Sequence, residues 1–592
     1  MGRHIGLHIF SLLGVLAGWP GPFGPDCVPC SSPGVSPPSS RRPLNPHSLL
    51  TLENKPSDPS NHRFQANHVS QPLAAARRRR RPAGVGPSIN LAARSSSRPD
   101  LRRRSAASGR FVLARVSIHQ SAGLPIPPME SPPLKRNVAQ DDDIISALTD
   151  DLLLAILERL DLRDAVRAGA VSTRWRHLPH RLSRLELDAG HFGGATLVDT
   201  MDAFTSALLF VCPPAERGCD CHRSRVIKTL DLSFYLLNPH LSSIGSAIED
   251  VVSRGKTTGL ALQISPPPGQ YTAQLIAMFG QMFMSFSRAY QVAFRWLTRL
   301  CLKGLAFEDS DVTDLINGCD GLKQLTLSSC WMVEHSVLNI DTPCSGLQEF
   351  KFIDFGGKWI ELVSVPKLRQ VTCLCWRFEN PPVRFGYVPE LRDVTFTCQA
   401  KAWQAPFLLS QCLSTSVTNP WKLHLHFAGQ MIWIQPEHPK QLTAIFRNLT
   451  GLSLLGVFPE CDLSWTLFIL EAAPALQFLS LSQDRHSCVK TSEDSAEKTN
   501  VVWEPSKDLK HLNLKVLQMY GFEEDDKVTN YIRLIMERAV GLKIIILRRK
   551  FPCKECNDIE LEKGSEMNEA SWCRVKKRLT NGSYSSVEII IC

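Results

Sequence analysis

The chain has 592 residues, 43% of them hydrophobic, which is long enough for roughly two to four domains with sizeable cores. Its formal net charge of +10 is unevenly placed, because the first 140 residues hold 19 lysines and arginines against 5 acidic residues. Residues 141–592 therefore carry a net charge of −4, and no nucleic-acid partner is expected for this part of the chain.

Residues 1–140 are rich in proline, serine and arginine, and they show almost no periodic apolar pattern after residue 20. This composition predicts a disordered basic extension. The arginine run 77–81 is compatible with a nuclear-import signal or polyanion binding, but a solvated charge run is the favoured interpretation. Residues 5–19 resemble the apolar core of a signal peptide. No later segment has the roughly 18 uninterrupted apolar residues of a membrane span, so no membrane partner is expected.

The 19 cysteines are scattered through apolar runs, which is typical of a reducing compartment. A zinc site needs four ligands at tetrahedral spacing, and no cysteine pair has a second pair at a suitable distance. We therefore expect no metal and no cofactor. The candidates weighed were Cys27 with Cys30, Cys553 with Cys556, and Cys219 and Cys221 with His222.

Residues 146–178 predict three short helices with more apolar surface than they can bury among themselves. Thr149 is placed to cap the first helix, with Asp150 and Asp151 in its first turn, and Asp161 is placed to cap the second. A unit of roughly 35 residues rarely encloses a core alone, so the surplus must face the rest of the chain or another protein. The apolar stripe of the first helix consists of Leu148, Leu152, Leu153, Ile156, Leu157 and Leu160.

The order of these residues resembles the F-box family, whose pattern ends in Val-Ser-x-x-Trp-Arg. Residues 171–176 read VSTRWR here, whereas Thr149 stands where the family usually has proline. The resemblance implies that residues 141–180 bind a Skp-type adaptor, and through it a cullin. An ordinary amphipathic helical hairpin is the alternative. The side chains expected to contact the adaptor are Leu148, Leu152, Leu153, Ile156, Leu157, Leu160, Leu162, Val166, Val171, Trp175 and Leu178.

A Leu-x-x-Leu-x-Leu pattern then recurs, and its copies begin 25, 25, 21 and 23 residues apart between Leu297 and Leu391. Each copy predicts a short strand followed by a helix or loop, and neighbouring copies stack into an irregular leucine-rich-repeat solenoid of α/β class with parallel strands on a concave face. Cys330 falls where such repeats carry Asn or Cys. A doubly wound α/β domain is the alternative, but several connections are short or proline-rich. The copies begin at Leu182, Ile227, Leu260, Leu297, Leu322, Leu347, Leu368, Leu391, Leu423, Leu449, Leu476, Leu514 and Leu542, weakly at 260 and 423.

Residues 230–245 and 294–311 resemble a grass-type subfamily of plant F-box/leucine-rich-repeat proteins, and the region from Asn513 resembles the FBD module of such proteins. We therefore divide the folded part into the F-box, a solenoid at 181–510 and an FBD-like region at 511–592. The FBD-like region is expected to form a strand, an acidic turn, a helix and a strand. Trp503, in a polar insert at 484–508, is expected to pack on the solenoid. The inner stripe of the FBD-like helix is Val528, Ile532, Ile535 and Met536.

No catalytic constellation is visible, so the chain is not expected to be an enzyme. His424 and His426 alternate on a predicted strand and are interpreted as a half-exposed strand face. The resemblance implies a substrate-recognition subunit of a Skp–cullin–F-box ubiquitin ligase in the cytoplasm or nucleus, with the repeats binding an unidentified target protein. This location speaks against export by residues 5–19. Two alternatives are a scaffold whose F-box helices only cap the solenoid, and a receptor with a small molecule on the concave face.

Overall fold

The computed structural model describes residues 148–212 except 161 and 171, then 226–399, 404–413, 420–483, 501, 503–548, 569–580 and 586–592. The chain divides between Ser131 and Pro132, and every described residue belongs to the second unit. The predicted basic extension, the expected cap Asp161, Val171 and the paired cysteines considered as metal ligands all lie outside the described residues.

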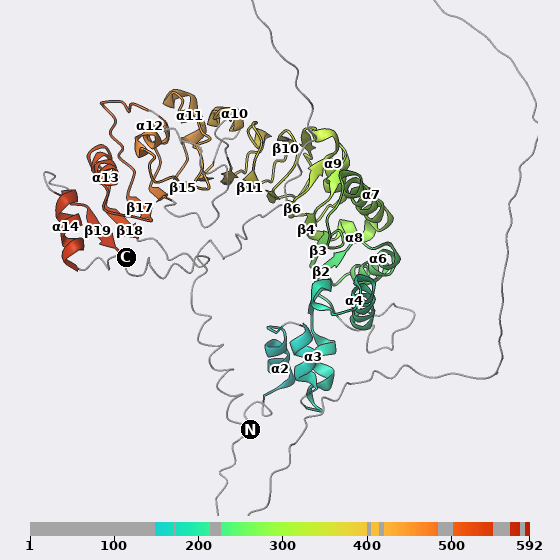
Figure 1. Ribbon diagram of the computed structural model, residues 1–592. Helices are drawn as coiled ribbons and strands as arrows, with labels where there is room; N and C mark the ends of the chain where they lie inside the picture. The colour runs from blue at the N-terminus through green and yellow to red at the C-terminus, as the bar shows by residue number, and fades with distance from the viewer. Residues whose placement is uncertain are drawn as a thin grey trace, which may run out of the picture. The chain divides into compact units, whose positions relative to one another are not determined.

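The described residues are built around one parallel sheet of fourteen strands that follow one another in chain order (Figure 1). A doubly wound fold reverses its strand order at a switch point, and this sheet does not, so the predicted solenoid is confirmed. The strands are β1 (Arg184–Asp188), β2 (Thr229–Tyr235), β3 (Gly259–Ser265), β4 (Leu297–Lys303), β6 (Gln324–Ser328), β9 (Glu349–Ile353), β11 (Gln370–Trp376), β13 (Asp393–Cys398), β14 (Lys422–His426), β15 (Gly451–Val457), β16 (Phe478–Gln483), β17 (Val516–Tyr520), β18 (Ile544–Arg548) and β19 (Glu588–Ile591).

The apolar positions of the repeats lie in register across the sheet and form its core. Leu325 of β6 pairs with Phe350 of β9, and the row continues through Val371, Val394 and Leu423 on the next strands. All of these side chains are buried. Every copy of the sequence pattern supplies buried side chains to this layer, and each of the thirteen predicted copies corresponds to a strand of the sheet.

A recurrent turn follows the strands in the most regular part of the solenoid. Gly304, Ser329 and Asp354 stand at equivalent places after β4, β6 and β9, and all three have a positive φ of 47–63°. The amide of each donates a hydrogen bond to a carbonyl of the next strand. Cys330 follows this turn, and its thiol donates to the carbonyls of Leu302 and Ser328. Burial raises the pKa of Cys330 to about 12, so its thiol serves as a buried donor.

The helices lie on one side of the long sheet (Figure 1), which leaves the other face to strand side chains; the face without helices is the one predicted to be concave. The return segments are α4 (Leu197–Val211), α6 (Asn238–Ser253), α7 (Ala273–Ala289), α8 (Gln291–Arg295), α9 (Asp311–Gly318), α10 (Leu409–Cys412), α11 (Pro439–Phe446), α12 (Leu467–Ala472), α13 (Asp526–Arg538) and α14 (Glu569–Thr580), with short 3-10 turns η2 (Ala189–His191), η3 (Val333–His335) and η4 (Leu463–Thr466).

Three consecutive returns in the middle of the solenoid are strands, where the sequence predicted only helices or loops. β8 (Leu338–Asp341), β10 (Ile360–Ser364) and β12 (Val383–Tyr387) form a second parallel sheet in the order β12-β10-β8. The returns here are short and β-branched, and their inward side chains are buried in register, as with Ile360 opposite Val383. A smaller pair, β5 (Ala306–Phe307) and β7 (Trp331–Met332), joins the return before β6 to the return that also contains β8.

The FBD-like region continues the same sheet. Its predicted strand, turn, helix and strand are β17, residues 521–525, α13 and β18, and the four residues of the predicted inner stripe of α13 are all buried. Trp503 packs on the core with its ring 5.9 Å from that of Phe468, as predicted. The sequence did not predict the last strand, β19, which pairs with β18.

Gly280 tests how tightly α7 packs on the repeat beneath it. A Cβ at this position would overlap the backbone oxygen of Ala306, although alanine favours helices by about 0.5–1 kcal/mol over glycine. We expect Gly280→Ala to destabilise α7 and β5 by about 1–3 kcal/mol, measured by hydrogen exchange. The control is Gly318→Ala in α9, where no atom beyond the local helix backbone lies within 4 Å of the added methyl carbon and stability should not fall. Equal effects of the two substitutions would contradict the packing.

Candidate functional site

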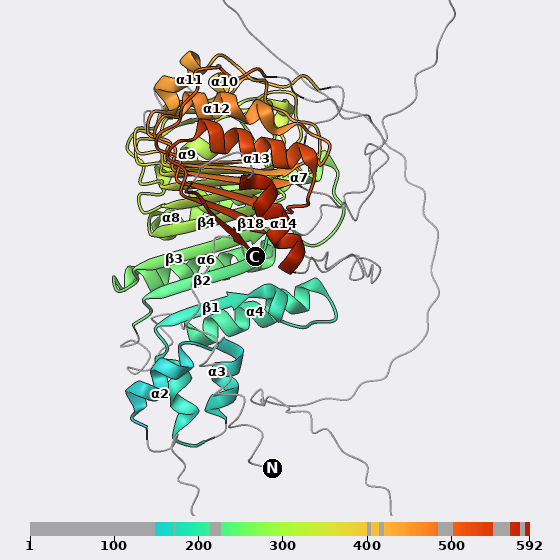
Figure 2. The same ribbon diagram turned by 90° about the vertical axis from the view of Figure 1, so that its left-hand side faces the viewer.

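The predicted F-box forms three short helices ahead of β1. They are α2 (Asp150–Leu157), α3 (Leu162–Gly169) and the 3-10 helix η1 (Trp175–Arg181), with η1 in contact with both others. Figure 2 shows α2 and α3 beside β1, which α3 contacts. Leu153, Leu157 and Leu178 are buried in the same core as the solenoid, so these three of the predicted adaptor contacts serve the packing of the chain itself.

The other predicted contact residues divide into two groups. Leu148, Leu162 and Trp175 are partly buried against the core. Leu152, Ile156, Leu160 and Val166 are exposed, at 53%, 44%, 43% and 51% of their surface. Leu152 and Ile156 lie four residues apart on α2 and therefore share one face of the helix. Leu160 follows α2 and Val166 lies on α3, so each of the first two F-box helices or its end carries exposed aliphatic side chains. We call these four side chains the F-box stripe.

The start of α2 is held differently from the sequence expectation. Thr149 occupies the N-cap position, but its side chain makes no capping hydrogen bond. Instead, Arg174 donates to the carbonyl oxygen of Leu148 at 2.6 Å and to Oδ1 of Asp150 at 2.9 and 3.1 Å. The hydrogen bond from Arg174 lowers the pKa of Asp150. The long side chain of Arg174 thus links the third helix to the first.

Glu158 joins the F-box to the first repeat. It follows α2, and its Oε1 accepts hydrogen bonds from the amide (3.1 Å) and the hydroxyl (2.6 Å) of Ser183, the residue before β1. The hydroxyl hydrogen bond is the main reason that the pKa of Glu158 is lowered. Leu182 and Leu185, on either side of Ser183, are buried in the core shared by the two parts. The F-box helices and the solenoid are therefore packed together.

The helix-free face changes chemistry along the sheet. At its N-terminal end Asp231 pairs with Arg299 at 2.6 Å and neighbours Glu186, opposite it on β1, and Asp188. Burial raises the pKa of Asp231, and the two neighbouring carboxylates add to this effect. Farther along, the register places hydroxyl side chains in one row on β6, β11, β13, β15 and β16, interrupted by Lys351 of β9 and by a histidine of β14: Thr326, Thr372, Thr395, Ser453 and Ser480. The sequence could not predict these neighbours because strand register was not known.

The predicted histidine pair lies on this face. His424 of β14 is half-buried opposite Thr395 and Ser453, and burial lowers its pKa. Nδ1 of His426 accepts a hydrogen bond from the amide of Ala428 at 3.0 Å, which gives this ring a role in the turn after β14. The interpretation as a half-exposed strand face is confirmed for both residues.

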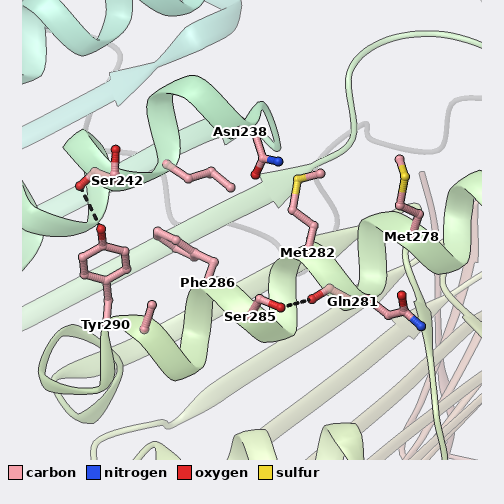
Figure 3. Close-up of a pocket in the computed structure, with 10 residues that line it drawn as sticks. Asn238, Ser242, Met278, Gln281, Met282, Ser285, Phe286 and Tyr290 are labelled. Carbon is pink, nitrogen blue, oxygen red and sulfur yellow. Dashed lines mark hydrogen bonds between the residues drawn. The ribbon is translucent and has the colours of Figure 1, made fainter. Parts of the chain in front are cut away.

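A groove of about 510 Å³ lies on the opposite, helical side, between α6 and α7 (Figure 3). Met278, Met282 and Phe286 of α7 line it, and the hydroxyl of Tyr290 donates to the carbonyl oxygen of Ser242 across it at 3.1 Å. The polar lining residues are neutral amides and hydroxyls: Asn238, Ser242, Gln281 and Ser285. The groove thus contains no nucleophile with an activating base.

The described part of the chain offers little else for catalysis or metal binding. No three His, Cys, Asp or Glu side chains within it are placed to hold a metal ion. Burial raises the pKa of the thiols of Cys319, Cys330 and Cys461 to about 12, which is the opposite of the activation that a reactive cysteine needs. Of the helices described, none is long and apolar enough to cross a membrane.

The junction at Glu158 predicts a pH-dependent contribution to stability. We expect Glu158→Gln to weaken the protection of α2 and η1 by up to about 1 kcal/mol at neutral pH, measured by hydrogen exchange. Since the folded pKa lies below the ordinary value of 4.5, the contribution is complete above that value and is lost as the pH falls through the folded pKa. Glu379→Gln, at an exposed position after β11 and away from the F-box, is the control. If the difference in protection between wild type and Glu158→Gln is as large at low pH as at neutral pH, the junction does not depend on the charge of Glu158.

Two family profiles match the sequence. The F-box domain profile covers residues 145–186, which span α2 to β1, and the LRR domain profile of At1g61320/AtMIF1 covers residues 274–581. The second match includes just over half of the chain. The structure extends the repeats farther toward the N-terminus, because β1, β2 and β3 belong to the same sheet.

Curated proteins of Arabidopsis thaliana give the same result. The F-box/FBD/LRR-repeat protein At1g80470 is 38% identical over 34% of this chain and 42% of its own length. The putative F-box/LRR-repeat protein At1g56400 is 24% identical over 38% of this chain and 49% of its own length, so the chain spans less than half of these two relatives. The putative FBD-associated F-box protein At5g56440 is 23% identical over 71% of this chain and 94% of its own length. With its F-box helices, its leucine-rich-repeat sheet and these matches, the chain belongs to the plant family of F-box/leucine-rich-repeat proteins.

Proposed function

We propose that this protein is the substrate-recognition subunit of a Skp–cullin–F-box ubiquitin ligase. In this role the F-box stripe binds a Skp-type adaptor, and through it a cullin, while the helix-free face of the repeats holds a target protein. The observation that carries the proposal is the exposure of four aliphatic side chains on a domain whose other described leucines are buried or partly buried: Leu152, Ile156, Leu160 and Val166. Exposed apolar patches of this kind mark interaction sites.

The size of the F-box stripe is consistent with part of such an interface. Complete burial of one aliphatic side chain contributes about 1.5–3 kcal/mol, and these four are already about half buried. Together they supply several kcal/mol, whereas a micromolar complex requires about 8 kcal/mol after the costs of association. The half-buried Leu148, Leu162 and Trp175 and polar groups at the edge are the further contacts that the complex would use.

A simple capping role fits the F-box less well. The cap of a solenoid needs an apolar inner face and a polar outer face. The inner face is present, since Leu153, Leu157 and Leu178 are buried with the repeats. The outer face, however, carries Leu152 and Ile156 on α2, so a cap alone leaves this apolar surface unexplained.

The proposed contribution of the chain to ubiquitination is proximity. A target held on the repeats is brought to a high effective concentration near the ubiquitin-conjugating enzyme, and the chemistry takes place on other subunits. The buried, high-pKa cysteines of the described residues fit this division of labour. Since cullin-based ligases act in the cytoplasm and nucleus, we place the protein there as part of the same proposal.

The adaptor interface is tested by charge substitutions in the F-box stripe. Leu152→Asp and Ile156→Asp should each weaken binding of a purified plant Skp-type adaptor by about 30-fold or more, because each carboxylate would be buried at the interface without a partner. The control is Leu275→Asp on α7, whose side chain is similarly exposed but lies outside the F-box.

Leu153→Asp is not a clean test, because Leu153 is fully buried and a carboxylate there should unfold the F-box. It serves as the folding reference, with α2 monitored by hydrogen exchange. If Leu152→Asp and Ile156→Asp both bind the adaptor as tightly as wild type while α2 stays protected, the proposed function is ruled out.

A further inference from the structure

Exposed cations and exposed apolar side chains gather where strands β14 to β18 begin. Lys422, Lys515 and Lys543 are exposed at the starts of β14, β17 and β18. Trp421 and Phe478 lie among them, and Leu512 and Val540, on the segments just before β17 and β18, are 71% and 58% exposed. We call the surface made of these seven exposed side chains the C-terminal rim: Trp421, Lys422, Phe478, Leu512, Lys515, Val540 and Lys543.

Register places these groups on adjoining strands. Lys422 is opposite Gly451, Gly451 is opposite Phe478, and Phe478 is opposite Val516. Since neighbouring strands are about 4.8 Å apart, Lys422 and Phe478 are separated by about 10 Å across a residue without a side chain. A Cβ at Gly451 would meet only the side chain of Lys422, at 3.5 Å, and the carbonyl of Trp421, at 4.0 Å. Gly451 therefore leaves an open notch between a cation and an aromatic ring.

The C-terminal rim is positive although residues 141–592 are acidic overall. Arg392, which stacks on Trp421 at 5.3 Å, adds another positive charge beside it. The nearby Glu390 is paired with Arg369 at 3.0 Å, and Asp393 is half-buried opposite Lys422. Glu588, exposed on β19, is an acidic neighbour of Lys543, whose carbonyl accepts the Glu588 amide. Lys422, Lys515 and Lys543 outnumber it, so the exposed charge that a ligand meets at the C-terminal rim is mainly positive, interspersed with apolar side chains.

We propose that the C-terminal rim binds an acidic peptide segment of the target protein, with an apolar side chain of that segment seated between Lys422 and Phe478. The proposal rests on the proposed function, because it assigns the substrate class to the target-binding face. Charge complementarity favours aspartate and glutamate opposite Lys422, Lys515 and Lys543. Leu512 and Val540 supply the apolar contacts that isolated surface charges lack.

RNA, the other polyanion that basic surfaces attract, fits less well. Binding of single-stranded nucleic acid relies on bases stacking on free aromatic faces. In the C-terminal rim Arg392 already stacks on Trp421, and two of the most exposed apolar groups, Leu512 and Val540, are aliphatic. Such groups suit the side chains of a peptide.

The far end of the same face would add selectivity. Glu186, Asp188 and Asp231 give the N-terminal strands a negative surface that is only partly offset by Arg299. An acidic segment would be repelled there and attracted at the C-terminal rim, so one end of the sheet disfavours what the other end binds.

The test is selection of a random-peptide phage library on the full-length protein. Peptides with several acidic residues and an apolar residue should be enriched, and a fluorescein-labelled copy of the most enriched peptide should bind about tenfold more weakly to Lys515→Glu/Lys543→Glu. Gly451→Phe, which fills the notch without adding charge, should weaken the same peptide. The matched control is Lys323→Glu, because Lys323 directly precedes β6 as Lys515 directly precedes β17. The backbone carbonyls of Lys323 and Lys515 each accept a hydrogen bond from the first amide of the neighbouring strand, β9 or β18.

The proposal is overturned if the enriched peptides are not acidic, if their binding is unchanged in Lys515→Glu/Lys543→Glu and in Gly451→Phe, or if a labelled single-stranded RNA binds the C-terminal rim in preference to the peptides. Adaptor binding by the same proteins is measured separately. If the wild-type protein binds the acidic peptides but not the adaptor, the ligase role alone is rejected. If it binds the adaptor but not acidic peptides, only the assigned substrate class is rejected.

Discussion

The structure depends on one constraint: no repeat can bury its own apolar face. Each strand supplies two or three leucine-like side chains to a layer that is complete only when the neighbouring strands are in register, as Leu300, Leu325 and Phe350 are. Parallel strands with short returns satisfy this constraint in strict chain order. At each end of such a sheet, the apolar layer of the outermost strand has no neighbouring strand to cover it. At the first end, α3, η1 and the Glu158–Ser183 hydrogen bonds extend the core into the F-box.

The same constraint separates stability from recognition. Residues that point into the core must be apolar, and the helices or outer strands cover only that side. The alternate positions, which the repeat pattern leaves unspecified, make up the helix-free face. They are free to differ from strand to strand, and they do: carboxylates on β1 and β2, hydroxyls in the middle, and Lys422 and Phe478 on β14 and β16. In the proposed role, target selection therefore depends on residues that no repeat consensus describes.

Sequence was sufficient wherever a feature follows from local periodicity. The leucine spacing predicted thirteen strands, and the helical spacing of apolar residues predicted the inner stripe of α13, because both need only a period and a buried side. The sequence was not sufficient where the burial of a side chain or the pairing of a strand depends on its neighbours in space. Leu152 and Leu153 are adjacent and chemically identical, yet one is exposed and the other buried, since only one faces the shared core. The returns β8, β10 and β12 form strands because they pair with one another, and β19 pairs with β18 without a leucine repeat of its own.

Distance along the sheet links the two proposed binding surfaces. Eleven strand steps separate β1, beside the F-box, from β17, beside the C-terminal rim, which is about 50 Å along the sheet at about 4.8 Å per step. The continuous ladder of backbone hydrogen bonds resists change in this separation. An extended target segment spans about 3.3 Å per residue, so a lysine some fifteen residues from an acidic segment bound at the C-terminal rim could reach back to the F-box end. A globular target with its acidic segment on a short loop would instead have to present lysines from its own far surface. The position of the C-terminal rim therefore favours targets whose acidic segment lies in a long flexible region.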